Sequence, residues 1–239
     1  MSDRQGPPAD DGIESVVREI DDWLLAHAPV LHATMTPGAS EAELAGVEAA
    51  VGRRLPAAFH ALYRRHEHWQ WAFGALHLSV NSDHYSLDVA AVMMTNSTQA
   101  PHFDYREAGM SSVPDDAVNT EFIDVGRLPL ITDGGGNYVG LDFLPGPAGV
   151  EGQVLAWGRD DHAWTVLADS LDGFLREVAT RLRQGRVTVV HPEGDPHEQQ
   201  VLLTDDAGVA AVAGHRQMVD FFPGFGAAPT RLPAILGRS

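Results

Sequence analysis

The sequence predicts an α+β fold, because helical and strand-like patterns occupy separate stretches of the chain. Apolar residues recur at helical spacing up to residue 63, and from residue 76 onward they alternate with polar residues over short runs. The chain has 239 residues, of which 44% are hydrophobic and 21% charged. This composition is typical of a globular protein with a sizeable core, and it excludes fibrous, collagen-like and disordered classes.

The first helix is expected to begin just after Asp11, because Glu14 follows three residues later in a capping pattern. It is expected to end near residues 27–29, and residues 30–39 are expected to form a connection. The apolar stripe of this helix consists of Val16, Val17, Ile20, Trp23 and Leu24.

Two more helices are expected before residue 66. Ser40 and Glu43 form a capping box at the start of one, and Gly52 is its natural stop. Leu55 and Pro56 then restart the chain, because proline suits the first position of a helix. The apolar stripes of these two helices are Leu44, Val47 and Val51, followed by Phe59, Leu62 and Tyr63.

Short strands are expected in the middle of the chain. Residues 76–80 and 85–89 alternate around a polar turn and predict a hairpin, whereas residues 90–116 show only a helical pattern at 92–98 within polar surface sequence. Further strands are expected at residues 122–125, 128–132, 138–143, 153–157 and 164–167. The strand at 138–143 places Val139, Leu141 and Phe143 on one face and Tyr138, Gly140 and Asp142 on the other.

The C-terminal part begins with a helix. Asp169 and Ser170 cap it, its apolar stripe runs to Leu182, and Gly185 ends it. Residues 187–190 and 201–204 alternate and are expected to extend the sheet, before an aromatic and proline-rich tail. The predicted organisation is a flexible segment at 1–12, an α+β domain at 13–185 and a C-terminal extension at 186–239 with a β-hairpin and a proline-rich, aromatic tail.

The charge of the chain excludes several classes of function. Thirty-three acidic residues face 16 basic ones, all arginine, which gives a net charge of −17, or −5 if all 12 histidines are protonated. The electrostatic field of so acidic a chain repels nucleic acid and anionic membranes and favours a basic protein partner. No cysteine occurs, which excludes disulfides and thiolate metal sites. The chain shows no signal peptide and no apolar run long enough to span a membrane, so a cytoplasmic protein is expected.

Two blocks of sequence resemble the SUKH superfamily. The first is the spacing Glu48-x-x-x-Gly52-x-x-Leu55-Pro56 with the aromatic helix after it, and the second runs from residue 130 through Asp133-Gly134-Gly135-Gly136-Asn137 to residue 175. The resemblance covers roughly residues 40–185. One departure is the stretch 65–69, where the superfamily often has an Asn-Gly pair.

The resemblance implies helices packed on a mainly antiparallel sheet, in a protein that binds another protein and catalyses nothing. The superfamily groups fungal regulators of cell-wall glucan synthesis with bacterial immunity proteins. The expected function is an immunity protein that neutralises a basic toxin domain, a nuclease or a deaminase. The alternative is a regulatory scaffold in cell-wall or signalling assemblies, and the oligomeric state is left open.

Candidate site residues come from these blocks and from the acidic stretch at residues 115–124. The residues expected to contact the partner are Asp115, Asp116, Asp133, Asn137, Tyr138, Asp142 and Trp157. The residues expected to shape the backbone are Gly52, Leu55, Pro56, Gly134, Gly135 and Gly136. The glycine run is interpreted as an Asx-type turn, because it lacks the lysine of a phosphate loop and the closing glutamate of an EF-hand.

Other chemistry is weighed against simpler interpretations. His60, His66 and His68 could bind a metal, but their spacing is not that of a metallohydrolase, so solvated or capping histidines are favoured and neither a metal nor a cofactor is predicted. Trp69, Trp71 and Phe73 alternate and are interpreted as a core face, with a binding stripe as the alternative. An enzyme would need histidine and carboxylate groups that converge in one cleft, and the spacing shows no sign of this.

Overall fold

The computed structural model describes residues 12–69, 109–121, 126–132, 136–191, 194–208 and 218–226. Its α-helices are α1 (Ile13–His27), α2 (Pro29–His32), α3 (Glu41–Val51), α4 (Ala57–Arg65) and α6 (Leu171–Arg183). Its strands are β1 (Ser111–Val113), β2 (Arg127–Thr132), β3 (Asn137–Asp142), β4 (Gln153–Gly158), β5 (Ala163–Ala168), β6 (Val187–Val190) and β7 (Gln200–Leu203), and a 3-10 turn covers Met218–Phe221. The predicted hairpin at 76–89, the pattern at 92–98, the strand at 122–125 and the side chains of Trp71 and Phe73 lie outside the described residues.

The main sheet has the strand order β1-β5-β4-β3-β2. The β2–β3, β3–β4 and β4–β5 pairs are antiparallel, and β1 pairs with β5 in parallel. The predicted α+β class with a mainly antiparallel sheet is therefore confirmed. The last two strands do not extend this sheet as expected, because β6 and β7 pair only with each other in the described part of the chain.

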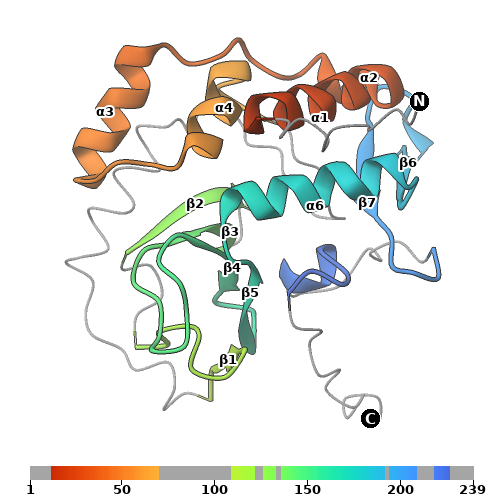
Figure 1. Cartoon of the computed structure of the whole chain (residues 1–239). Helices are drawn as coiled ribbons and strands as arrows, with labels where there is room; N and C mark the ends of the chain where they lie inside the picture. The colour runs from red at the N-terminus through yellow and green to blue at the C-terminus, as the bar shows by residue number, and fades with distance from the viewer. Residues whose placement is uncertain are drawn as a thin grey trace, which may run out of the picture.

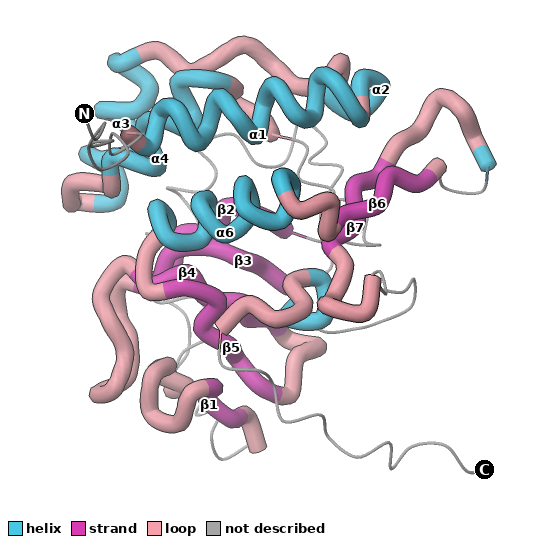
Figure 2. Tube along the Cα trace, turned by 45° about the vertical axis from the view of Figure 1, so that its right-hand side comes forward, coloured by secondary structure: helices cyan, strands magenta, loops and turns pink. Residues whose placement is uncertain are grey.

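The helices lie in layers over one face of the sheet. Figure 1 shows α6 between the strands and the layer formed by α1 and α4, and Figure 2 shows the same order from another side. The large core lies between these layers, and it includes Ile20 of α1, Phe59 of α4, Leu175 of α6 and Leu141 of β3. Since α1 contacts both α4 and α6, its position is fixed from two sides.

A smaller apolar cluster covers the opposite face of the sheet. It consists of Ala117, Val118, Leu155, Trp157, Trp164 and Val166, with Tyr138 packed against it. Both faces of β3 and β4 are therefore buried over most of their length.

The helix ends match the local signals in part. Ser40 and Glu43 form the predicted capping box, Gly52 ends α3 with a left-handed backbone at φ 74°, and the Ser170 hydroxyl accepts a hydrogen bond from the Gly173 amide at the start of α6. The start of α1 differs from the prediction, because Gly12 is its N-cap and supplies no side-chain cap. The predicted connection after α1 also contains the short helix α2, which begins at the proline after Ala28.

Residues after 185 contribute to the same large core. Phe222 and Phe225 pack against Phe174 of α6, with ring centroids 5.6 and 5.4 Å away. Arg181, on the same helix, donates hydrogen bonds to the carbonyl oxygens of Thr204 and Pro223 at 3.4 and 2.5 Å. We call residues 218–226, which include Phe222 and Phe225, the aromatic clasp.

Candidate functional site

A charged groove lies where α3 and α4 meet the start of α1. It has a volume of about 460 Å³, and we call it the α3–α4 groove. Its lining residues are Ile13, Glu14, Glu41, Ala45, Glu48, Arg54, Leu55, Ala57, His60 and Arg64. Three carboxylates, two guanidinium groups and one imidazole thus line a single depression.

Residues of the first sequence block, Glu48 to Pro56, form the floor of this groove. Glu48 stands near the end of α3, and its Oε1 atom accepts hydrogen bonds from the Leu55 amide at 2.8 Å and from Nε2 of His60 at 3.0 Å. Gly52 reverses the chain between these groups, and Pro56 is the N-cap of α4 rather than its first residue. One carboxylate therefore holds both the loop and the next helix.

These hydrogen bonds lower the pKa of the Glu48 carboxyl below its ordinary value of 4.5, the Leu55 amide most and His60 next. Because the folded-state pKa is lower than the unfolded one, Glu48 stabilises the fold above about pH 4.5, and this contribution is lost as pH falls toward the folded-state pKa. Glu48→Gln is expected to flatten the fall in unfolding free energy between pH 6 and pH 3, measured by urea titration at several pH values.

The control for this prediction is Glu198→Gln, which changes an exposed glutamate in the loop between β6 and β7. It should leave the pH profile as it is in the unmodified chain. Equal profiles for all three proteins would show that Glu48 contributes nothing specific to the fold.

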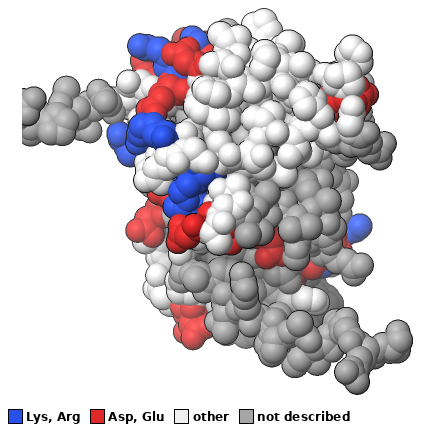
Figure 3. Space-filling model, turned by 90° about the vertical axis from the view of Figure 1, so that its right-hand side faces the viewer, with Lys and Arg blue, Asp and Glu red and all other residues white. Residues whose placement is uncertain are grey.

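Ion pairs between arginine and glutamate side chains lie on the rim of the groove. Arg64 donates to Glu41 from Nε at 2.5 Å and from Nη2 at 3.0 Å, and its Nη1 lies 3.7 Å from Glu14. Arg54 is exposed beside them. Figure 3 presents another face, the one opposite α3 in Figure 1, and there too acidic and basic side chains adjoin along one side while the upper middle is uncharged. The surface on this face is therefore mixed in charge, not uniformly acidic.

The residues expected to contact a partner fall into different environments. Asn137, Asp142 and Trp157 are buried, with 2%, 0% and 1% of their surfaces exposed. Tyr138 is half-buried and rests on the Trp157 ring at a centroid distance of 5.4 Å.

The remaining candidates lie elsewhere. Asp115 and Asp116 are exposed, on the loop after β1. Gly136 is half-buried with φ 101°, and an added Cβ would come within 3.1 Å of the Arg159 side chain. Asp133, Gly134 and Gly135 lie outside the described residues, and the partner-binding role of all these residues stays a prediction.

Asp142 belongs to a buried polar network that the sequence did not reveal. Its carboxylate accepts hydrogen bonds from Gln153 Nε2 at 3.0 Å and from the Leu144 amide at 3.1 Å, and Nε of Arg127 lies 4.0 Å away. The Arg127 guanidinium also stacks 4.5 Å from the Trp164 ring. This network fixes the ends of three strands, and its burial indicates a structural role.

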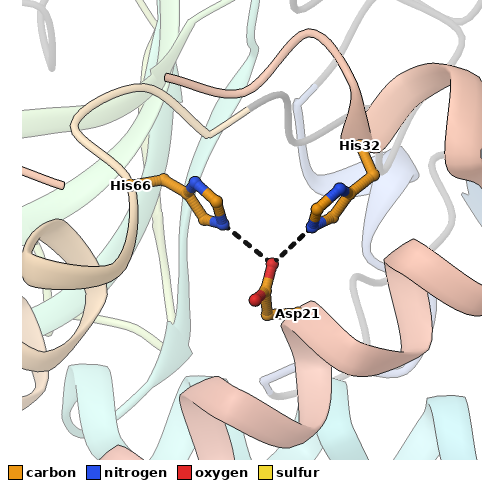
Figure 4. Close-up of side chains that lie close together, drawn as sticks. All are labelled: Asp21, His32 and His66. Atoms are coloured by element: carbon orange, nitrogen blue, oxygen red, sulfur yellow. Dashed lines mark hydrogen bonds and ion pairs between the residues drawn. The ribbon is translucent and has the colours of Figure 1, made fainter. Parts of the chain in front are cut away.

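A second buried carboxylate gathers histidines from distant segments. Oδ1 of Asp21, on α1, lies 2.9 Å from Nε2 of His32 and 2.8 Å from Nε2 of His66, as Figure 4 shows. Its other oxygen, Oδ2, accepts from Nε of Arg65 at 2.5 Å. Burial raises the pKa of the Asp21 carboxyl, but the hydrogen bonds from His66, Arg65 and His32 together outweigh it and hold the pKa below its usual range.

Sequence reasoning considered His66 but missed Asp21 and His32. The three residues lie on α1, at the end of α2 and just after α4, so no single helix face or motif joins them. His60 pairs with Glu48 instead, and His68 contacts the Thr36 hydroxyl through Nδ1 at 3.3 Å. Trp69 is buried and donates to the Leu62 carbonyl oxygen at 2.8 Å, which agrees with its interpretation as a core residue.

Comparison with known families places most of these elements in one block. The profile of the SMI1 / KNR4 family (SUKH-1) matches residues 38–177, which is more than half of the chain. The matched range begins just before α3 and ends within α6.

Individual relatives are similar over a shorter stretch. The chain is 36% identical over 84 residues to the cell wall assembly regulator SMI1 of Saccharomyces cerevisiae, which is 35% of this chain and 17% of that protein. It is 40% identical over 75 residues to the glucan synthesis regulatory protein of Neurospora crassa, or 31% of this chain and 14% of that protein. A KNR4/SMI1 homolog of Kluyveromyces lactis is 36% identical over 84 residues, or 35% and 16%. The chain thus spans less than a fifth of these relatives.

In the part of the chain that the structure describes, no helix combines the length and hydrophobicity needed to cross a bilayer.

Proposed function

Because the chain belongs to the SMI1 / KNR4 family (SUKH-1), we propose that it is a non-enzymatic regulatory protein that acts by binding another protein. The observation that carries this proposal is the family match over residues 38–177. Relatives named for the regulation of cell wall assembly and of glucan synthesis support a role in an assembly of that kind. Its partner would be a protein component of the assembly, which the chain binds without altering it chemically.

The α3–α4 groove is the docking site that we assign to this function. It lies almost entirely within the matched range, and the first sequence block forms its floor. Glu14, Glu41 and Arg64 on its rim and the exposed Arg54 offer charges of both signs. A partner segment with complementary charges would gain in association rate and specificity from such a surface.

This assignment is tested with Arg54→Glu, using affinity capture from a lysate of the source organism and mass spectrometry. A partner that the unmodified chain captures is expected to be lost or reduced on the order of tenfold, since like charges across an interface cost several kcal/mol. The matched control is Arg159→Glu, an equal charge change at a side chain that is 68% exposed and lies next to Gly136.

Arg159→Glu also tests the partner-contact residues that were predicted from the sequence. Loss with Arg159→Glu and retention with Arg54→Glu would place docking near Asn137 and Tyr138 and reject the groove. Equal capture by both variants and the unmodified chain would reject both surfaces.

A second candidate function is an immunity protein that neutralises a basic toxin domain. The observation that favours it is the net charge of −17 in a chain without lysine, which suits a basic nuclease or deaminase. The same capture at low and then high salt separates the two functions. A basic toxin domain that elutes with salt would support neutralisation, whereas a salt-resistant component of wall synthesis would support the regulatory role.

A further inference from the structure

The cluster of Asp21, His32 and His66 has the donor set of a metal centre. One carboxylate oxygen and two imidazole nitrogens, from three separate segments, lie within 4.8 Å of one another. Figure 4 shows both Nε2 atoms directed at the same oxygen of Asp21. The side chains are 3%, 20% and 14% exposed for Asp21, His32 and His66, so the donors are shielded from bulk water but still reachable.

The hydrogen bonds of His66 direct one ring nitrogen at Asp21. The Thr36 carbonyl oxygen, which can only accept, lies 2.8 Å from Nδ1, so Nδ1 donates to it. Nε2 lies 2.8 Å from Oδ1 of Asp21, and a proton or a metal ion between these two atoms holds them together. A metal ion bound by both atoms would take the place of that proton and release it.

The surroundings of the donors are those that orient metal ligands. A ligating histidine commonly donates its other ring N–H to a backbone carbonyl, as His66 does to Thr36. A ligating carboxylate is commonly held through its second oxygen, as Arg65 holds Oδ2 of Asp21. Arg65 adds positive charge nearby, but it leaves Oδ1 to the two histidines.

The spacing fits a small ion with little movement. Metal bonds of about 2.0–2.1 Å in a tetrahedral arrangement separate neighbouring donors by roughly 3.3 Å. The two nitrogen–oxygen distances are 2.8 and 2.9 Å, so each nitrogen needs to part from the oxygen by only about half an ångström, and the three donor atoms lie within 4.8 Å of one another. Imidazole donors select zinc and its neighbours over calcium and magnesium, which prefer oxygen.

We propose that Asp21, His32 and His66 form a binding site for a divalent transition-metal ion of the zinc class, with the fourth position open to water or to a donor from a partner. The ion would join α1, the end of α2 and the residue after α4. Binding only the folded chain, it would stabilise this helical layer.

The proposal is tested on the full chain after treatment with a chelator and removal of the chelator. Zinc chloride is titrated by calorimetry, and thermal unfolding is followed with and without the ion. We expect one zinc per chain and a higher Tm with zinc. His32→Gln and His66→Gln should each lower the affinity on the order of tenfold or more and abolish the rise in Tm.

The matched control is His60→Gln, because His60 also pairs with one carboxylate, Glu48, but is not a member of the Asp21 cluster. It should bind zinc as the unmodified chain does. Absence of saturable binding, or equal binding by His32→Gln and the unmodified chain, would overturn the proposal. Circular dichroism checks that each variant is folded, and if one histidine variant unfolds the other decides the outcome.

Discussion

Arg127→Met is expected to lower the unfolding free energy by about 3–5 kcal/mol, because it leaves the Asp142 carboxylate buried without its cation. Both side chains are almost fully buried, at 1% and 0% exposure. Arg127 also donates to the Asn119 carbonyl oxygen at 2.6 Å and stacks on Trp164, so its loss affects three contacts. Urea unfolding followed by tryptophan fluorescence measures the change.

The control for this variant is Arg159→Met, which removes an arginine from the exposed pair with Asp160 at 3.8 Å. It should cost less than about 1 kcal/mol, since surface pairs contribute little. The double variant Arg127→Met with Asp142→Asn should lose less than the sum of the two single losses, because the unpaired charge is removed. A loss for Arg127→Met as small as that for Arg159→Met would contradict a structural role for the buried pair.

Gly140→Ala is expected to destabilise the sheet by at least about 3 kcal/mol, because overpacking against backbone leaves no side chain to move aside. Gly140 lies in β3 opposite Pro129, where the register of β2 shifts. A Cβ atom at this position would lie 2.1 Å from the Leu128 carbonyl oxygen and 2.8 Å from the Pro129 Cα atom. The two strands would have to separate, which thermal unfolding should register as a large fall in Tm.

Gly46→Ala is the matched control for the same chemical change. Gly46 is exposed in the middle of α3, and an added Cβ would have nothing within 4 Å. Alanine favours a helix interior over glycine by up to about 1 kcal/mol, so this variant should be slightly more stable than the unmodified chain. If Gly140→Ala were equally harmless, the close approach of β2 and β3 would be wrong.

Local signals in the sequence predicted most of the elements, because each depends on a few neighbouring residues. The capping box at Ser40, the stop at Gly52 and the cap at Ser170 are all of this kind. The alternation in residues 138–143 also placed Val139 and Tyr138 on opposite faces, and they do pack in different clusters.

Pairing between distant segments could not be predicted in the same way. β1 has only three residues and pairs in parallel with a strand about 50 positions later, so no turn marks it. β6 and β7 alternate as a sheet extension would, yet their partners are each other, which alternation alone does not decide.

The candidate site shows the same division. One short stretch of chain holds Glu48, Gly52 and Leu55, so their motif could be recognised from the sequence. The burial of Asn137, Asp142 and Trp157 could not be predicted, because the residues that pack over the sheet come from segments far along the chain. Three helices lie between Asp21 and His66 along the chain, and only the fold brings the two residues together.

The aromatic clasp sets an order of events during synthesis. α6 leaves the ribosome about 40 residues before Phe222 and Phe225, which cover Phe174 in the finished fold. Until then Phe174 lacks this cover, and exposed apolar surface of this kind is bound by chaperones and aggregates when synthesis stalls. Chains interrupted between residues 185 and 218 should therefore be the species that quality control removes, although every strand of the main sheet has already been made.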